Sequence, residues 1–293
     1  MKKTHTYDVV QHMVLVLTSL MCVIPFVLLI VASFSSEASI ARNGYTFFPS
    51  EWSLEAYKYM LREKAQILRA YGVTVIVTVV GTTGSIVIST LLAYPLSRPD
   101  LSGRKVWNFL LFFTLLFNGG LVPSYLLWTR YLHLGNTIWA LIFPNLFMNA
   151  FYVIMIRSYY QSSIPYELIE AARMDGAGEW KIYSSMILPL SKPILATVGL
   201  FVGLSYWNDW NNGLIYVTNN NSLNSIQLLL YKMMENVKFM SNNSSMAGTM
   251  AGQLPTSSVR MAIAVVGVLP VLLVYPFVQK FLVKGIVVGA VKG

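Results

Sequence analysis

Residues 163–193 have the sequence SIPYELIEAARMDGAGEWKIYSSMILPLSKP, a polar stretch between two long apolar runs. Pro165 suits the first turn of a helix, where its missing N–H would be unbonded in any case. The Gly-Ala-Gly sequence at 176–178 allows the backbone to turn. A second short helix is predicted from Glu179 to about Ser185, and Pro189 is expected to end it. The stretch therefore predicts a helix–turn–helix outside a membrane, held at both ends by membrane-spanning segments.

The composition of the 293-residue chain is that of an integral membrane protein. Hydrophobic residues make up 55% and charged residues only 11%, whereas soluble proteins average about 25% charged residues. The net charge of +9 comes from basic residues dispersed beside apolar runs, a pattern typical of membrane anchoring rather than of a nucleic-acid partner. One cysteine and three scattered histidines offer neither a disulfide nor metal-ligand spacing. We therefore expect an all-α protein in contact with membrane lipid.

Six apolar segments are long enough to cross a bilayer as helices. In the second segment Gly81, Ser85 and Ser89 recur every four residues, so one face is small enough for close helix packing. The third is interrupted at residues 118–120, and lipid tolerates such a break only where it faces protein or water. Both termini are expected in the cytoplasm. The predicted spans are 13–33, 71–96, 106–128, 137–156, 193–212 and 261–283, with external loops at 34–70 and 213–259.

The spacing within residues 163–190 resembles the EAA loop of permease subunits in binding-protein-dependent ABC importers. Glu-Ala-Ala at 170–172 is followed after three residues by Gly176, and after nine more by Met-Ile-Leu-Pro at 186–189, where the family usually has Ile in place of Met186. The resemblance implies a single transmembrane domain over 1–293 in a bacterial cytoplasmic (inner) membrane. It also implies that this loop docks into a surface cleft of an ATPase subunit.

The same resemblance implies the partners and the docking residues. Expected partners are a second permease subunit, two ATP-binding subunits and an extracytoplasmic solute-binding protein. The chain has no GxxxxGK[ST] phosphate loop, so ATP and Mg are expected on the partner chains, with no cofactor and no enzymatic activity here. Asp175 has a second interpretation, in which it only caps the break before Gly176. The docking candidates are Glu170, Ala171, Ala172, Asp175 and Gly176.

Three further segments resemble the carbohydrate branch of these permeases. They are residues 117–123, residues 134–137, and Leu254-Pro255 before Arg260. Within that branch the chain resembles the maltose-type second permease and its relatives for complex oligosaccharides. The resemblance therefore implies a sugar or oligosaccharide as the substrate.

A polar and aromatic group ends the fifth span about 14 residues from its start, which places it about 21 Å from the cytoplasmic face. Amides and carboxylates can bond sugar hydroxyls and aromatic faces can stack on pyranose rings, so this group predicts a substrate path. The alternative is an interfacial aromatic belt in which Asp209 reaches water. Amides in spans three and four either line the same path or hold helices together. The path candidates are Trp207, Asn208, Asp209, Trp210, Asn145, Asn149 and Asn118.

Two other functions fit a polytopic chain with a polar loop. An ion-gradient secondary transporter would use the intramembrane Asp209, and inverted repeats or paired broken helices would favour it. A non-transporting membrane scaffold would use residues 163–193 only as a partner site. Uptake into vesicles driven by ATP or by an ion gradient distinguishes the three.

Overall fold

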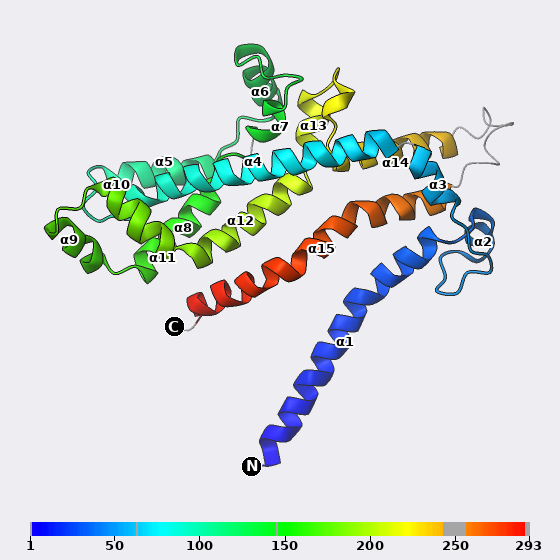
Figure 1. Cartoon of the computed structure of the whole chain (residues 1–293), viewed down its shortest axis with the longest axis horizontal. Helices are drawn as coiled ribbons and strands as arrows, with labels where there is room; N and C mark the ends of the chain where they lie inside the picture. The colour runs from blue at the N-terminus through cyan, green and yellow to red at the C-terminus, as the bar shows by residue number, and fades with distance from the viewer. Residues whose placement is uncertain (1, 63, 145, 243–255, 291–293) are drawn as a thin grey trace. The chain divides into compact units, whose positions relative to one another are not determined.

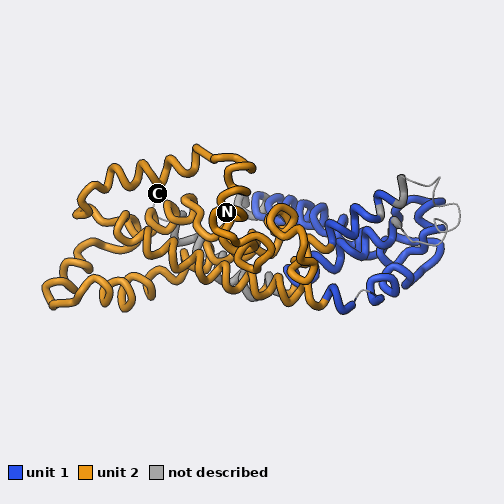
Figure 2. The backbone as a smooth tube through the Cα atoms, turned by 90° about the horizontal axis from the view of Figure 1, so that it is seen from above, with its two compact units in different colours: residues 1–67, 230–272 blue, residues 68–229, 273–293 orange. Residues whose placement is uncertain are grey.

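The computed structural model describes residues 2–62, 64–144, 146–242 and 256–290, and these residues are mostly helical (Figure 1). Within these ranges the β-type pairing is one isolated antiparallel bridge, between Ser35 and Trp52. The predicted all-α class is therefore confirmed. The backbone forms two compact units, coloured separately in Figure 2: unit 1 has residues 1–67 and 230–272, and unit 2 has residues 68–229 and 273–293.

Unit 1 carries the N-terminal apolar helix. This helix is apolar from Tyr7 to Ser33, with a mean hydropathy of 3.0 in its most apolar window, and none of that window is buried. Short helices follow it, and Ser36 caps the first of them by accepting a hydrogen bond from Ser39 N at 3.1 Å. The helices that lie wholly or partly in unit 1 are α1 (Lys2–Ser33), α2 (Glu37–Asn43), α3 (Glu55–Arg62), the first residues of α4 (Lys64–Ser97), α14 (Ile226–Asn242) and α15 (Thr256–Ala290).

The carboxylate of Glu37 joins α2 to the start of α15 within unit 1. Its two oxygens each accept a hydrogen bond from Ser257 N at 3.0 Å. Oε2 also accepts from Ser258 N at 3.1 Å and from Ser258 Oγ at 3.3 Å. The first N–H groups of a helix have no partner within it, and its N-terminus favours negative charge. Glu37 therefore stabilises the start of a 35-residue helix.

Unit 2 has a core of aliphatic and aromatic side chains from several helices. Val153 and Ile156 of one helix and Val198 and Tyr206 of another are at most 1% exposed. Its helices are α4 (Lys64–Ser97), α5 (Arg104–Leu116), α6 (Leu121–Leu126), α7 (Trp139–Ile142), α8 (Ala150–Ser163), α9 (Tyr166–Met174), α10 (Glu179–Ile182), α11 (Leu188–Leu190), α12 (Lys192–Trp207) and α13 (Asn211–Tyr216), with π turns at Leu127–Tyr131 and Tyr183–Ile187.

The number of continuous spans is lower than the six expected from hydropathy. Among the described residues two helices are long and apolar enough to cross a membrane, Tyr7–Ser33 and Lys64–Ser97. Two bent pairs raise the number to four if each counts as one span. The six-span topology therefore stays a prediction. The bent pairs are Arg104–Leu116 with Leu121–Tyr131, at 108°, and Glu179–Leu190 with Lys192–Trp207, at 78°; a shorter apolar helix covers Ser257–Leu273.

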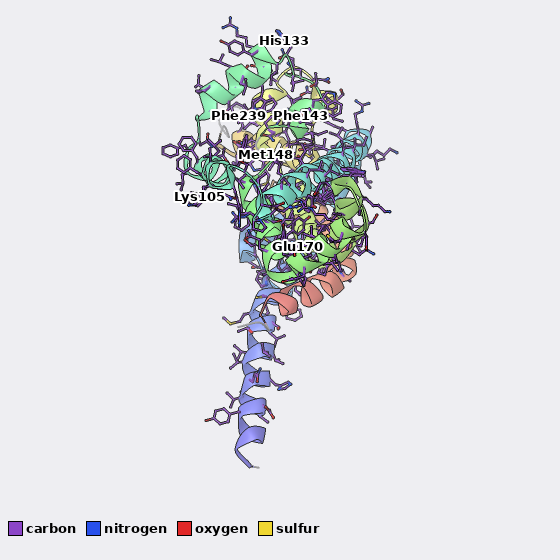
Figure 3. The ribbon with its side chains drawn as sticks, turned by 90° about the vertical axis from the view of Figure 1, so that its left-hand side faces the viewer. Lys105, His133, Phe143, Met148, Glu170 and Phe239 are labelled. Carbon is purple, nitrogen blue, oxygen red and sulfur yellow. The ribbon has the colours of Figure 1, made fainter. Side chains whose placement is uncertain are left out.

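Helix breaks account for much of this difference. The expected break at 118–120 is present, because α5 ends at Leu116 and α6 begins at Leu121. The segment 137–156, expected to be a continuous span, is also broken between α7 and α8 (Figure 3 labels Phe143 and Met148 within the break). Pro144 has no N–H to donate to the carbonyl oxygen of Ala140, so the helical hydrogen-bond pattern stops there. The proline therefore gives a physical reason for the second break.

Two segments expected to be irregular or short are helical. The expected external loop 213–259 contains α14, whose start is buried through Ile226 and Leu228. The second helix of the 163–193 stretch, expected to end near Ser185, continues through a π turn to Leu190. Pro189 lies in the first turn of α11, where a missing N–H costs little, so it does not end the helix there.

The small face predicted on α4 is confirmed. Gly81, Ser85 and Ser89 are all buried, and Gly81 lies against the ring of Tyr206 from α12. A Cβ added at Gly81 would lie 2.4 Å from Tyr206 Cζ. The Tyr206 hydroxyl donates to the carbonyl oxygen of Ile142 at 2.8 Å, which fixes the ring in place. The close contact of α4 with α12 thus depends on the missing side chain at position 81.

We expect Gly81→Ala to lower the free energy of unfolding by about 1–3 kcal/mol, because the ring must move or lose its bond to Ile142. The measurement is the thermal unfolding midpoint of the detergent-solubilised protein. Gly72→Ala is the matched control, since it lies on the same helix and its added Cβ would have no heavy atom within 4 Å. A midpoint for Gly81→Ala equal to that of the control would contradict this packing.

Candidate functional sites

The predicted helix–turn–helix is formed by α9 and α10. Pro165 is the N-cap of α9, and Glu167 lies in its first turn, near the positive end of the helix. Gly176 follows the helix with φ 77°, the left-handed conformation that glycine adopts most readily. Gly176 N donates to Arg173 O at 2.9 Å, and Ala177 N donates to Ala172 O at 2.9 Å. The glycine predicted to form the turn therefore forms it.

The docking candidates lie on two sides of α9. Glu170, Ala171, Asp175 and Gly176 are exposed, and Figure 3 labels Glu170 well apart from His133 of the same unit. Ala172 is 8% exposed and packs inward with the buried Ile169. Two large side chains not singled out from the sequence are also exposed here, namely Met174 at 87% and Trp180 at 70%.

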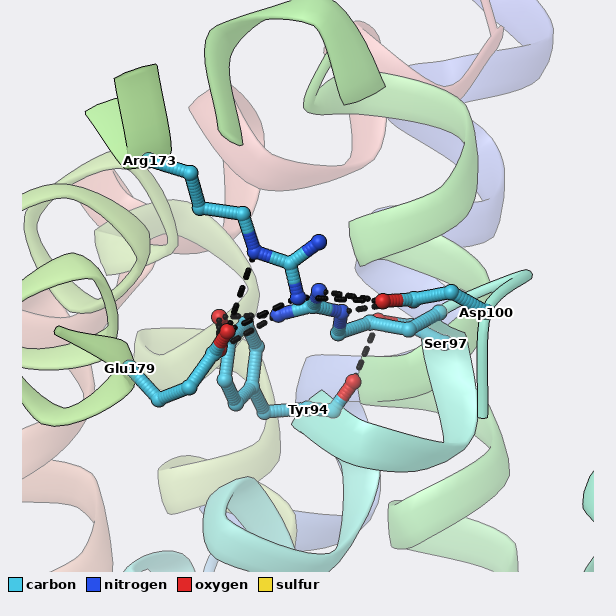
Figure 4. Close-up of polar contacts among 6 residues, drawn as sticks. Tyr94, Ser97, Asp100, Arg173 and Glu179 are labelled. Carbon is cyan, nitrogen blue, oxygen red and sulfur yellow. Dashed lines mark hydrogen bonds and ion pairs between the residues drawn. The ribbon is translucent and has the colours of Figure 1, made fainter. Parts of the chain in front are cut away.

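A network of ion pairs ties α10 to the end of α4 (Figure 4). The Arg98 guanidinium donates through Nε to Asp100 Oδ1 at 2.9 Å and through Nη2 to Asp100 Oδ2 at 2.7 Å. Its Nη1 also forms an ion pair with Glu179, the first residue of α10. Arg173 of α9 donates to Glu179 Oε1 at 2.8 Å and to Asp100 Oδ2 at 3.0 Å. Tyr94 completes the network by donating to Glu179 Oε2 at 2.8 Å.

The Arg98 side chain is much more buried than the two carboxylates that it contacts. The Arg98 side chain is 6% exposed, whereas those of Asp100 and Glu179 are 41% and 53% exposed. Burial acts to lower the pKa of Arg98, but the hydrogen bond to Asp100, together with Tyr94, Tyr166 and the charge of Glu179, outweighs it and holds the pKa above its ordinary value. The sequence marked Arg98 only as one basic residue among several, since nothing in its spacing shows that Glu179 lies beside it.

We expect loss of the two carboxylates of this network to destabilise the fold more than loss of the Arg98 guanidinium. Asp100→Asn combined with Glu179→Gln leaves a buried, unneutralised guanidinium, which costs about 3–5 kcal/mol. Arg98→Met leaves two carboxylates that water and Arg173 still reach, so it should lower the unfolding midpoint less. Thermal unfolding in detergent compares the variants.

Glu235→Gln is the matched control for this comparison. It removes an exposed ion pair with Lys238, of 2.7 Å, and such pairs contribute about 0–1 kcal/mol. If Arg98→Met is at least as destabilising as the double variant, burial of Arg98 does not control the energetics of the network.

The second candidate site is the break between α12 and α13. Asp209 Oδ1 accepts hydrogen bonds from Asn211 N at 3.1 Å and from Asn212 N at 3.2 Å, so it caps α13. Ser225 Oγ donates to the backbone oxygen of Asp209 at 3.0 Å. The carboxylate therefore has a structural role as a cap, and Asp209 is half-buried.

The neighbours of Asp209 differ in exposure and in hydrogen bonding. Asn208 is exposed; its Nδ2 donates to Leu204 O at 2.9 Å, and its Oδ1 accepts from Gln227 Nε2 at 3.4 Å. Trp207 Nε1 is buried and has no hydrogen-bond partner among the described residues. Trp210 is 39% exposed. The break thus presents an amide and an indole beside a fixed carboxylate.

The break after α12 packs against the break between α7 and α8. Tyr206 OH donates to Ile142 O at 2.8 Å, and Asn212 Nδ2 donates to Pro144 O at 3.0 Å. Asn149 caps α8 by accepting from Phe151 N at 2.9 Å. Asn118 is exposed and accepts from Gly120 N at 2.9 Å in the break after α5. Asn145, the remaining path candidate, lies outside the described residues.

The apolar helices, their polar breaks and the exposed α9–α10 element are typical of a membrane transport protein. Residues 5–288 match the family of inner membrane components of binding-protein-dependent transport systems, and the chain belongs to this family. The chain is therefore a permease subunit of an ABC importer and not an enzyme. Membership implies a second permease, an ATPase and a binding protein as partners.

Relatives match over nearly the full length of the chain. The polygalacturonan/rhamnogalacturonan transport system permease protein YtcP of Bacillus subtilis (strain 168) is 38% identical, covering 99% of this chain and 100% of that protein. Protein LplC of the same organism is 36% identical, covering 100% and 97%. The crystal structure of a bacterial ABC transporter involved in the import of the acidic polysaccharide alginate contains a chain 30% identical, with a TM-score of 0.79 and coverage of 96% and 98%.

The family match also decides between the rival functions. Paired broken helices are the feature expected of an ion-gradient transporter, and the breaks after α7 and α12 do lie together. Such breaks need only face protein or water, and they are not specific to one transport mechanism. The full-length match to importer permeases therefore outweighs them.

Proposed function

We propose that this chain carries a sugar or oligosaccharide across the bacterial inner membrane, forming the path together with a second permease. The main support is full-length similarity to permeases named for such substrates, among them the polygalacturonan/rhamnogalacturonan permease and a trehalose/maltose permease of Thermococcus litoralis, which is 28% identical over 95% of this chain. An extracytoplasmic binding protein delivers the substrate. Two ATP-binding subunits hold ATP and Mg and supply the energy.

In this proposal the chain is one transmembrane domain over residues 1–293 with six spans. Both termini and the α9–α10 element lie in the cytoplasm, and lipid surrounds the outer apolar faces. The unburied apolar surface of α1 supports this arrangement, because it needs lipid or the second permease as a neighbour.

The coupling step is assigned to the exposed side of α9 and its turn. Glu170 and Asp175 offer charges to the ATPase subunit, Ala171 permits close approach, and Met174 adds an exposed apolar contact. Ala172 supports the helix from its buried side. A movement of α9 and α10 would reach the end of α4 through Arg98 and Glu179, because these two groups are joined directly.

The translocation step is assigned to the break after α12. Asn208, with Trp207 and Trp210 beside it, faces the path, and Asp209 holds the break in shape by capping α13. Asn118 and Asn149 lie in similar helix breaks and are weaker candidates for the path. Each already accepts a hydrogen bond from a backbone N–H close in sequence.

The direct test is uptake of labelled oligosaccharides into proteoliposomes that contain the whole complex. Uptake that requires ATP and the binding protein is the expected result. Uptake driven by an ion gradient without ATP would contradict the proposal, and so would the absence of ATP-dependent uptake for every neutral and acidic oligosaccharide tried.

We expect Gly176→Val to abolish most substrate-stimulated ATP hydrolysis while the membrane complex still inserts. A β-branched side chain is strained at φ 77°, so the turn that presents α9 must change shape. Gly178→Val is the matched control, because its backbone lies at φ −72° and its added Cβ would have no heavy atom within 4 Å. The assignment of the turn fails if Gly176→Val keeps normal stimulation in reconstituted vesicles.

We expect Asn208→Ala to slow uptake several-fold, because losing a hydrogen bond to a sugar hydroxyl in a water-poor site costs about 1–3 kcal/mol. Basal ATP hydrolysis should persist, since the α9–α10 element is roughly 20 Å away by helix length. Asp209→Asn keeps an oxygen that can cap α13 and removes only the charge. Asn219→Ala removes an exposed amide elsewhere and serves as the control. Unchanged uptake and coupling in both Asn208→Ala and Asp209→Asn would place the path elsewhere.

A further inference from the structure

A short loop is fixed against the end of α1 in unit 1. Ser53 N donates to Phe34 O at 2.7 Å, and Ser36 N donates to Glu51 O at 3.0 Å. Ser35 and Trp52 form the antiparallel bridge between these two bonds. The backbone of Trp52 is therefore held by flanking hydrogen bonds on both sides.

The side chain of Trp52 is exposed although its backbone is fixed. Trp52 is 65% exposed and lines a pocket of about 490 Å³ together with Phe34, Ser53, Leu54, Glu55 and Lys58. The ring of Phe34 stacks on Tyr57 with centroids 4.8 Å apart, and the Tyr57 hydroxyl is hydrogen-bonded to Ser33 Oγ at 2.8 Å. The ring of Phe34 and the backbone that carries the Trp52 ring are thus fixed before any ligand arrives, which lowers the entropic cost of binding.

The pocket lining carries one acidic and one basic side chain, Glu55 and Lys58. Lys58 lines the pocket, and Arg62 follows four residues later on the same face of α3. Both are exposed, and neither forms an ion pair with a carboxylate among the described residues. Glu55 supplies an acceptor in the pocket, and Ser53 Oγ is engaged with Glu55 N at 3.2 Å. The pocket therefore offers a flat apolar face, an acceptor and a cation.

We propose that this pocket is a subsite for one ring of a carboxylate-bearing oligosaccharide before it enters the membrane. Trp52 stacks on the apolar face of the pyranose, Glu55 accepts a hydrogen bond from a ring hydroxyl, and Lys58 pairs with the sugar carboxylate. Arg62 attracts the next acidic unit. The inference rests on the proposed function and adds to it the substrate class, an acidic sugar, and a first point of contact.

The chemistry of the pocket favours a sugar over the other occupant of exposed tryptophans in membrane proteins, the lipid headgroup region. An interfacial tryptophan needs only an apolar body and one polar tip. Here the indole stands in a pocket that is also lined by a carboxylate and an ammonium group, both from α3. Contact with lipid is the competing outcome of the test.

The experiment uses the whole transport complex, labelled with 5-fluorotryptophan and held in lipid nanodiscs. Trp52→Phe identifies the ¹⁹F signal of Trp52, and the probes are trigalacturonate and the neutral sugar maltotriose. We expect a saturable shift of the Trp52 signal with trigalacturonate and a weaker response to maltotriose. The signal of Trp107, which is 56% exposed on α5 outside this pocket, should not move.

Two variants test the role of the cation. Lys58→Gln should weaken trigalacturonate binding about threefold, as expected for an exposed ion pair. Arg42→Gln makes the same change in net charge at an exposed site of unit 1 outside the pocket, so it should leave the Kd unchanged. A Trp52 signal that ignores both sugars, or one that responds only to the lipid composition of the nanodisc, overturns the proposal.

Uptake measurements on the same complex keep this inference separate from the proposed function. Trp52→Ala should raise the KM for trigalacturonate uptake about tenfold and leave the maximal rate unchanged, since the ring binds but does not drive transport. If ATP-driven uptake is normal and KM is unchanged, the subsite is wrong and the function stands. If no oligosaccharide supports ATP-driven uptake in the wild-type complex, the proposed function itself fails.

Discussion

The buried guanidinium of Arg98 is the interaction on which the exposed end of unit 2 depends. It lies at the end of α4 and bonds to Asp100 on its own loop and to Glu179 at the start of α10, while Arg173 of α9 bonds to the same two carboxylates. A single set of charges thereby joins residues 98–100 to residues 173–179, two segments that are far apart in sequence. Because only Arg98 is deeply buried, the network is most sensitive to loss of negative charge.

The second organising constraint is the satisfaction of backbone polar groups where helices stop. Asp209, Asn149 and Asn118 each accept a backbone N–H at a helix break, and Thr74 Oγ1 accepts from Ile226 N at 2.8 Å at the start of α14. These polar side chains therefore have a structural role, because each satisfies a backbone N–H group. A side chain that is already engaged in a cap has less capacity for other partners, and Asp209 accepts two such bonds.

Patterns that act over a few residues were predictable from the sequence. The turn at Gly176, the small face at Gly81 and the break at 118–120 depend on local backbone freedom or residue size, and the structure confirms all three. The pairing of Arg98 with Glu179 and the anchoring of Trp52 join residues distant in the chain, and periodicity carries no signal for them. Helix α14 was missed because an apolar run of only a few residues does not stand out in a loop rich in asparagine and serine.

The contact between Glu37 and the start of α15 has a consequence for the order of synthesis. The two partners are 220 residues apart, so α2 leaves the ribosome long before Ser257 exists. At about 5–20 residues per second, the carboxylate waits on the order of ten seconds or more for its partner. Unit 1 therefore cannot be completed during translation of the first third of the chain. The contacts between α2 and the start of α15 therefore form late, and a chain truncated before the last helix would lack the bonds from Ser257 and Ser258 to Glu37.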